Sequence, residues 1–491
     1  MKKFIFYILV FLNLVAVFSC KKVLEESPKS LTVDAFYNTP AEVEAALAGI
    51  YAPLRSQMSG WWIGILESET EWGTGMSAAA NFDSFKSMAG VDKVGENNLI
   101  PIWNAFYVAI RNANLVIANV PNGKSLTEDQ KKVYLAEARF MRAFTYFQLV
   151  RGWGGVPLHT EKNLTESERI TKATKQQVYA LITEDLEYAE NLLPDKAALA
   201  GKPSKWAGKT LLADVYFYQA MHDKAAAKAN EVIMSAKHSL EKLTVADDFN
   251  KIFGMGASSP EEIFYLRYNV SSPSELVLFT QQITTPWFGS SGYGVINWHD
   301  KAKFYTTWDD KDLRKSFNWY KDSKANPFVS GQPEFPTTGV TILSPKKYNN
   351  PSATIATFSL PCYRFADVLL IFAEATAQAT APSAPAMERL NMVRRRAYGY
   401  DPLTPSAVDY KLSDYSSKSA FTNLVIQERG YETQLEGKRW FDLVRSGTVK
   451  EVMKNNINRD VADKHLLWPI PTIEFDLNKG LDRTKDQNPG Y

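Results

Sequence analysis

The 491-residue chain contains only two cysteines, Cys20 and Cys362, and only five histidines. Two cysteines allow at most one disulfide, so the chain is not a small disulfide-stabilised scaffold and packing must supply its stability. The histidines are scattered, and no HExxH pattern occurs among them. A zinc-protease site of that type is therefore excluded.

An excess of positive charge is also missing. The formal net charge is +2, and Lys2 and Lys3 stand in an N-terminal segment that we expect to be removed. Its removal takes the 56 basic residues to 54, equal to the 54 acidic residues. Nucleic-acid binding needs a basic face, so we expect no nucleic-acid partner.

Long apolar runs are confined to the N-terminus, and no other run approaches the 18 residues of a membrane-spanning helix. The first 20 residues, MKKFIFYILVFLNLVAVFSC, place two lysines before a short apolar stretch, as a secretory signal does. A small residue, Ser19, directly precedes Cys20, which is typical of bacterial lipoprotein signals. A free cysteine after an ordinary signal is the alternative.

We therefore expect residues 1–19 to be a signal peptide and residues 20–33 to be a tether lipidated at Cys20. Several acyl chains on one residue would hold the protein firmly at a membrane, where a single chain would not. Lipidation of Cys20 would leave Cys362 without a disulfide partner. Residues 34–491 are expected to form the folded body outside the membrane.

Helical periodicity is abundant in that body. Residues 34–58 place Val43, Leu47, Ile50 and Leu54 at spacings of three and four. Further helices are expected at 101–120, 128–151, 176–193, 205–219, 224–236, 363–379 and 387–397. Several of them form pairs similar to tetratricopeptide hairpins, at a spacing too irregular for a 34-residue array.

The helix predicted at 128–151 runs into Gly152-Trp153-Gly154-Gly155. Gly152 can end the helix, because glycine adopts the left-handed conformation that satisfies the last carbonyl groups. Glycine neighbours also let backbone approach closely, which suits a buried corner. We expect Trp153 to pack in the scaffold and not to bind a ligand.

Two segments lack this periodicity, near residues 59–100 and 240–360. Both are rich in aromatic residues, and the chain as a whole has 12 Trp and 23 Tyr. Irregular segments of this length are uncommon in a compact domain and are often functional.

Five stretches carry a resemblance to one family. They are AEARFMRAFTYFQLVRGWGGVPL (136–158), YRFADVLLIFAEA (363–375) with LNMVRRRA (390–397), ERGYETQLEGKRWFDLVRSG (428–447), LWPIP (467–471) and the final QNPGY (487–491). In this order, after a lipoprotein signal, they resemble the SusD/RagB family of outer-membrane lipoproteins of Bacteroidetes-type bacteria. The sequence departs from the family at Gly430 and Thr433, where an arginine and a large apolar residue are usual.

The resemblance implies a mostly α, SusD-like fold over residues 34–491, with a helix-pair scaffold of tetratricopeptide type and a loop-rich half that carries the ligand surface. It implies binding without catalysis and without a cofactor. The expected ligand is an oligosaccharide or polysaccharide, and the expected partner is a SusC-like TonB-dependent transporter of the outer membrane. The protein would be lipid-anchored there and face the cell exterior. Binding of peptides by the same architecture is the first alternative.

Sugar binding needs exposed aromatic planes beside polar side chains. Two stretches fit this requirement, GWWIGILESETEW with the residues after it and TTPWFGSSGYGVINWHD. The adjacent Trp61 and Trp62 would point opposite ways in an extended chain, so one could be exposed. Core packing is the competing interpretation for each ring. The candidate ligand residues are Trp61, Trp62, Trp72, Asn81, Asp83, Trp287, Tyr293 and Trp298.

Signals for an enzyme are weak. GSSG at 289–292 is one residue short of a nucleophile elbow, and Pro203 replaces the first glycine that a phosphate-binding loop would need. Glu67, Glu69 and Glu71 alternate, which predicts one solvated strand face more than a pair of glycosidase carboxylates. Asp312 and Arg314 are expected to form a local pair. A secreted glycan hydrolase and a purely structural lid remain as alternatives from other classes.

The shared motif at 428–447 is expected to be structural. Its charged residues recur at spacings of three and four, so opposite signs can pair along a helix. They are Glu428, Arg429, Glu432, Glu436, Arg439, Asp442 and Arg445.

Overall fold

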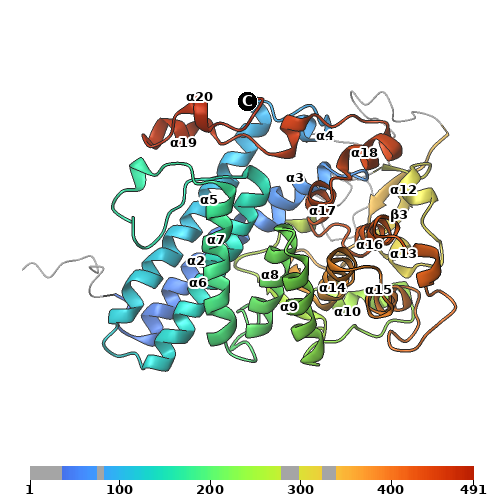
Figure 1. The fold of residues 1–491 in the computed structure, drawn as a ribbon, viewed down its shortest axis with the longest axis horizontal. Coiled ribbons are helices and arrows are strands. Elements are labelled where there is room, and N and C mark those ends of the chain that lie inside the picture. The colour runs from blue at the N-terminus through green and yellow to red at the C-terminus, as the bar shows by residue number, and fades with distance from the viewer. Residues whose placement is uncertain (1–35, 74–81, 278–297, 323–338) are drawn as a thin grey trace, which may run out of the picture.

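The computed structural model describes residues 36–73, 82–277, 298–322 and 339–491 (Figure 1). The predicted signal peptide and the whole of the predicted tether lie outside these ranges. Within them, helices dominate. The long helices are α2 (Pro40–Gln57), α5 (Lys93–Asn119), α6 (Glu128–Trp153), α7 (Lys175–Leu192), α8 (Lys205–Tyr218), α9 (His222–Met234), α14 (Phe365–Ala379), α15 (Ala384–Ala397) and α16 (Lys418–Glu432).

These helices confirm the mostly α prediction, and their starts follow from capping. Thr39 Oγ1 accepts a hydrogen bond from the Glu42 backbone N–H, and the Glu42 carboxylate accepts one from the Thr39 backbone N–H. The same reciprocal capping box opens α6 at Thr127 and α7 at Thr174. Each box satisfies backbone donors that a helix end otherwise leaves free.

The helices lie side by side across the molecule in Figure 1, from α2, α5, α6 and α7 through α8 and α9 to α14, α15 and α16. Neighbours in the chain pack as pairs, α6 with α7, α8 with α9 and α14 with α15. The paired arrangement confirms the tetratricopeptide-like scaffold expected from the sequence.

The remaining elements are short. The helical ones are η3 (Met58–Trp62), α3 (Ile63–Ser68), α4 (Asp83–Lys86), α10 (Asn250–Phe253), α12 (Lys303–Thr306), α13 (Leu313–Asn318), α17 (Arg439–Arg445), α18 (Val449–Ile457), α19 (Thr472–Leu477) and α20 (Arg483–Asp486). The strands are β1 (Glu262–Leu266), β2 (Trp298–His299), β3 (Trp319–Asp322), β4 (Ile342–Pro345) and β5 (Leu360–Arg364).

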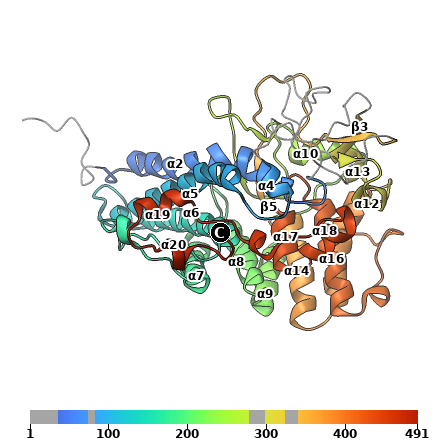
Figure 2. The ribbon, with the colours of Figure 1, turned by 90° about the horizontal axis from the view of Figure 1, so that it is seen from above.

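The strands form two small antiparallel sheets, β1 with β5 and β2–β4–β3. Figure 2 shows α10, α12, α13 and β3 gathered on one side of the C-terminal half, across from the ends of α14 and α16. The first segment expected to be irregular, 59–100, is helical over η3 and α3. This difference arises because Ile63, Ile65 and Leu66 are all buried in the core.

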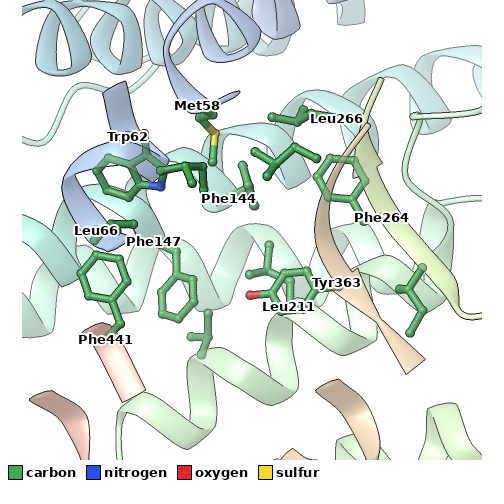
Figure 3. Packing of buried hydrophobic residues seen from close by; sticks show 14 of the residues in the cluster. Met58, Trp62, Leu66, Phe144, Phe147, Leu211, Phe264, Leu266, Tyr363 and Phe441 are labelled. Carbon is green, nitrogen blue, oxygen red and sulfur yellow. The ribbon is translucent and has the colours of Figure 1, made fainter. Parts of the chain in front are cut away.

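The core runs through the scaffold. Figure 3 shows Trp62, Phe144, Phe147 and Phe441 packed together, from η3, α6 and α17. Segments far apart in the chain therefore share one apolar interior.

Three of the five stretches that carry the resemblance meet at Trp153: 136–158, 467–471 and 487–491. The Trp153 ring is fully buried, with ring centroids 5.3 Å from Trp103 and 4.9 Å from Trp468, and its Nε1–H donates to the Pro469 carbonyl at 2.9 Å. Asn488 Nδ2 donates to the carbonyls of Trp153 and Trp468. The prediction that Trp153 packs in the scaffold is confirmed.

Gly152 and Gly154 divide the role that we expected Gly152 to fill alone. Helix α6 continues to Trp153, and Gly154 is the residue with positive φ, 74°, that follows it. Gly152 instead lets the Trp468 ring pack directly against the helix backbone, since a Cβ there would stand 2.8 Å from Trp468 Cε3. The glycine cluster therefore both ends the helix and seats the Trp468 ring.

Candidate functional site

The π-helical turn η3 contains both adjacent tryptophans and directs their side chains to different environments. It links α2 to α3 and changes the angular step between successive side chains, and such turns are frequent at functional sites. Trp62 enters the core, where it is 2% exposed and lies against Phe106, Trp153 and Trp468. Trp61 stays half-buried at the surface. The turn thus leaves the Trp61 ring partly exposed to solvent while Trp62 is buried.

Trp61 lies in a parallel stack on Phe82, with ring centroids 5.3 Å apart and planes inclined by 8°. The next residue, Asp83, opens α4 and is 60% exposed. Its carboxylate is 3.0 Å from Lys86 Nζ, and burial lowers the pKa of Lys86. We call Trp61, Phe82 and Asp83 the Trp61 corner. It combines an aromatic surface with an exposed carboxylate, as a sugar-binding surface does.

The structure corrects two other candidates. Trp62 and Trp72 are each 2% exposed, so neither presents a ring face to a ligand. Trp72 is held inside because its Nε1–H donates to Glu67 Oε2 at 2.7 Å and its ring lies against Phe304.

The remaining candidates cannot be placed. Asn81, Trp287 and Tyr293 lie outside the described residues. Trp298 begins strand β2, where its backbone pairs with Leu343, and its side chain is outside the description.

The acidic run Glu67, Glu69 and Glu71 does not form a solvated strand edge. It lies in α3 and the turn after it, and all three carboxylates are buried. Glu67 accepts hydrogen bonds from Trp72 and from the Gly437 backbone, Glu69 accepts one from Trp468, and Glu71 pairs with Arg439 at 2.7 Å. The three carboxylates hold the motif segments together.

Glu67 makes stability depend on pH. Burial raises the pKa of Glu67 to about 7, against the opposing effect of its donors Trp72 and Gly437. The folded chain therefore holds an extra proton between pH 4.5 and about 7. The associated stability is complete below pH 4.5 and is lost as pH rises through about 7, on the order of 3 kcal/mol for this shift.

Glu67→Gln should remove that dependence, because the amide is neutral at every pH. As pH rises from 4.5 to 8, the natural chain should lose unfolding free energy relative to the variant. Urea unfolding at a series of pH values measures this difference. Parallel pH profiles for the variant and the natural chain would show that Glu67 is ionised in both states.

The charged motif at 428–447 forms a buried network, as predicted, but most of its partners are distant in the chain. Among the described residues, three pairs lie within the motif: Arg429–Asp442, Arg445–Asp442 and Lys438–Glu436. The other pairs join it to other elements: Arg314–Glu428, Arg394–Glu428, Arg314–Glu432, Arg364–Glu432, Arg396–Glu432, Arg364–Glu436, Lys347–Glu436, Lys438–Asp367, Arg439–Glu71 and Arg445–Glu374. The predicted local pair is also confirmed, with Arg314 2.6 Å from Asp312.

The network explains one departure from the family pattern. A Cβ at Gly430 would stand 2.8 Å from Arg439 Nη1, so glycine leaves room for the guanidinium. Thr433 donates its hydroxyl to the Arg429 carbonyl at 2.8 Å and stays buried without an apolar side chain.

A separate concavity of about 520 Å³ lies between α5, the loop after Pro157 and α19. Figures 1 and 2 both place α19 beside α5. The sequence analysis singled out none of its residues. The available signal was Val108, which is 43% exposed on α5 with Asn104 and Arg111 one helical turn away on either side.

Comparison with known proteins agrees with this architecture. A family model described as "Starch-binding associating with outer membrane" matches residues 22–217, and one described as "SusD family" matches residues 297–491. SusD-like protein P2 of Formosa agariphila is 29% identical over 100% of both chains.

Solved structures show the same fold. A SusD homolog from Bacteroides thetaiotaomicron superposes with a TM-score of 0.73 at 23% identity, over 95% of this chain and 100% of that one. A laminarin-binding SusD-like protein superposes with a TM-score of 0.73 at 22% identity, over 93% and 100%. Together with the motifs that meet at Trp153, these matches show that the chain belongs to the SusD/RagB family.

Proposed function

We propose that this protein binds an oligosaccharide or polysaccharide at the cell surface and delivers it to a SusC-like TonB-dependent transporter. The observation that carries the proposal is the Trp61 corner, where a half-buried indole stacks on Phe82 and the next residue, Asp83, has an exposed carboxylate. Aromatic faces pack against the apolar faces of sugar rings, and carboxylates accept hydrogen bonds from hydroxyl groups. A fold relative is described as laminarin-binding, which supports a glycan as the ligand class.

The proposed place of action is the outer surface of the outer membrane, with Cys20 as the lipidated anchor. In the described part of the chain, no helix has the length and apolar character needed to cross a membrane. A lipid on the first residue of the mature chain would leave the Trp61 corner free to meet ligands and would keep the protein beside its transporter.

The proposed mechanism is binding without covalent chemistry. The carboxylates nearest to Trp61 in sequence, Glu67, Glu69 and Glu71, are buried and have structural partners. A purely structural lid predicts that all of the candidate tryptophans are buried, and the half-buried Trp61 supports a ligand role instead.

Trp61→Ala should weaken glycan binding at least tenfold, because truncating an aromatic anchor at the centre of a contact costs about 2 kcal/mol or more. The measurement is calorimetry and tryptophan fluorescence with the chain starting at Lys21, against a panel of polysaccharides and peptides. Trp206 is a matched control, a half-buried tryptophan on α8 whose Nε1–H donates to Asp195.

Trp206→Ala should leave glycan affinity unchanged. Equal losses in both variants would show a general effect on folding and would remove the Trp61 corner as the site. Binding of peptides without binding of any glycan would favour the peptide alternative.

A further inference from the structure

The concavity beside α5 is built as a ligand site. We call it the α5 groove; Tyr107, Arg111 and Asn114 line it from α5, Asn163 from the facing loop, and Glu474 and Leu477 from α19. Its volume of about 520 Å³ lies within the range of about 300–1,000 Å³ typical of small-molecule sites. All of its lining residues belong to the described part of the chain.

The walls of the α5 groove are fixed by hydrogen bonds. Tyr107 donates its hydroxyl to the Pro157 carbonyl at 2.8 Å, and the Tyr146 hydroxyl bonds to both the backbone N–H and the carbonyl of His159. Asn163 accepts from the Thr160 backbone and donates to the Leu158 carbonyl. A rigid wall loses little conformational entropy when a ligand binds.

The α19 side is fixed in the same way. Asn478 Nδ2 donates to the Ile170 carbonyl and to Glu474 Oε1, and Glu474 Oε2 accepts from Trp103 Nε1. The Lys479 backbone N–H donates to the Glu168 carbonyl. The C-terminal segment is thereby tied to the loop that faces α5.

An unused donor lies in the α5 groove. Asn114 is 1% exposed, and its Oδ1 accepts a hydrogen bond from Arg142 Nη1 at 2.7 Å. Because a guanidinium can only donate, this bond fixes the orientation of the amide. No described residue accepts from Asn114 Nδ2. A buried amide N–H without an acceptor costs free energy. A ligand atom that accepts a hydrogen bond from Asn114 Nδ2 would remove that cost.

An unpaired cation lies one helical turn away. Arg111 precedes Asn114 by three residues, so the two side chains share a face of α5. Arg111 is exposed, and it forms no ion pair with any residue in the described ranges. Burial lowers the pKa of the nearby His159, which leaves Arg111 as the unpaired positive charge of the groove at neutral pH.

The opposite side supplies other chemistry. Leu164 and Leu477 offer apolar surface, and Glu168 offers an exposed carboxylate that accepts from hydroxyl groups. A sugar ring has apolar faces and a rim of hydroxyl groups, and a carboxylate on it would accept from Arg111 and Asn114. We propose that the α5 groove is a second ligand site, separate from the Trp61 corner, that takes a short sugar chain carrying a carboxylate.

The test uses digalacturonic acid and its dimethyl ester, which keeps the sugar rings and removes the charge. Calorimetry on the chain starting at Lys21 should show saturable binding of the acid and at least tenfold weaker binding of the ester. Arg111→Gln should weaken binding of the acid at least tenfold, because a hydrogen bond between two charged groups is replaced by a neutral one.

Two further variants separate binding from folding. Val108→Asp places a carboxylate three residues before Arg111 on the exposed face of α5 and should abolish binding of the acid. Lys132→Gln removes an exposed cation of α6 and should leave the affinity unchanged. Trp61→Ala should also leave it unchanged, which keeps this test independent of the glycan proposal above.

Three results would overturn the proposal: no binding of digalacturonic acid, equal affinity for the acid and the ester, or an affinity for the acid that neither Arg111→Gln nor Val108→Asp changes. Displacement of the acid by a short peptide with a free C-terminal carboxylate, at higher affinity, would assign the groove to peptides instead.

Discussion

Replacing Arg364 with methionine should cost at least about 3–5 kcal/mol of the free energy of unfolding, or prevent folding altogether. Arg364 is fully buried, and its guanidinium lies 2.7 Å from both Glu432 and Glu436 and 3.2 Å from Glu261. Methionine has a similar volume but no charge, so the three buried carboxylates would lose their shared cation. Urea unfolding followed by circular dichroism measures the loss.

The effect of Arg364→Met should depend on pH. Arg364, Lys347 and Lys438 oppose burial and hold the pKa of Glu436 at about 2, below its usual 4.5. A lowered pKa contributes stability above pH 4.5 that is lost as pH falls through about 2. The difference between the natural chain and the variant should therefore shrink as pH falls from 4.5 towards 2.

Arg395→Met is the matched control. Arg395 is also buried, but its partners Glu388 and Asp409 reach solvent, with side chains 40% and 19% exposed. Water can take over part of the solvation of these carboxylates, so we expect a loss of only about 1 kcal/mol, as for surface pairs. Equal losses for the two arginines would show that burial of the partner carboxylates does not set the cost.

Trp153→Ala should cost about 3–5 kcal/mol of the free energy of unfolding, as large-to-small changes of buried aromatic residues do. The ring fills the space between Trp62, Trp103 and Trp468, and its removal leaves a cavity that these three large rings cannot close without moving. Urea unfolding followed by circular dichroism at 222 nm gives the change.

Trp153→Phe separates packing from hydrogen bonding. It keeps most of the ring but leaves the buried Pro469 carbonyl without the indole N–H that it accepts from at 2.9 Å. An unsatisfied buried acceptor costs about 1–3 kcal/mol. A Phe variant as unstable as the Ala variant would mean that the hydrogen bond, and not the filled volume, dominates.

The scaffold could be predicted because its signals are local. Capping residues and apolar spacing lie within one helix, so the expected helices at 128–151 and 205–219 appear as α6 and α8 with ends within two residues. The run from Glu67 to Glu71 was misassigned for the opposite reason. Its alternation is typical of a strand, and the residues that bury it, Trp468 and Arg439, lie 399 and 368 residues from their carboxylate partners.

The candidate site was predictable only in part. The sequence places Trp61 next to Trp62 but cannot say which ring is buried, because that choice depends on the π-helical turn and on Trp153 and Trp468. Trp61 stacks on Phe82, the neighbour of Asp83, and this contact joins segments that flank a stretch outside the described residues. The α5 groove was missed because α19 and the facing loop meet α5 only in the folded chain.

The dependence of Trp153 on Pro469 and Trp468 has a consequence for synthesis. The carbonyl that accepts from Trp153 lies 316 residues downstream. At about 5–20 residues per second, the ribosome needs roughly 15–60 s to reach it after Trp153 has been added. During that interval Trp153 has neither the Pro469 carbonyl nor the Trp468 ring, so the aromatic cluster around it stays incomplete until the C-terminal segment has been made.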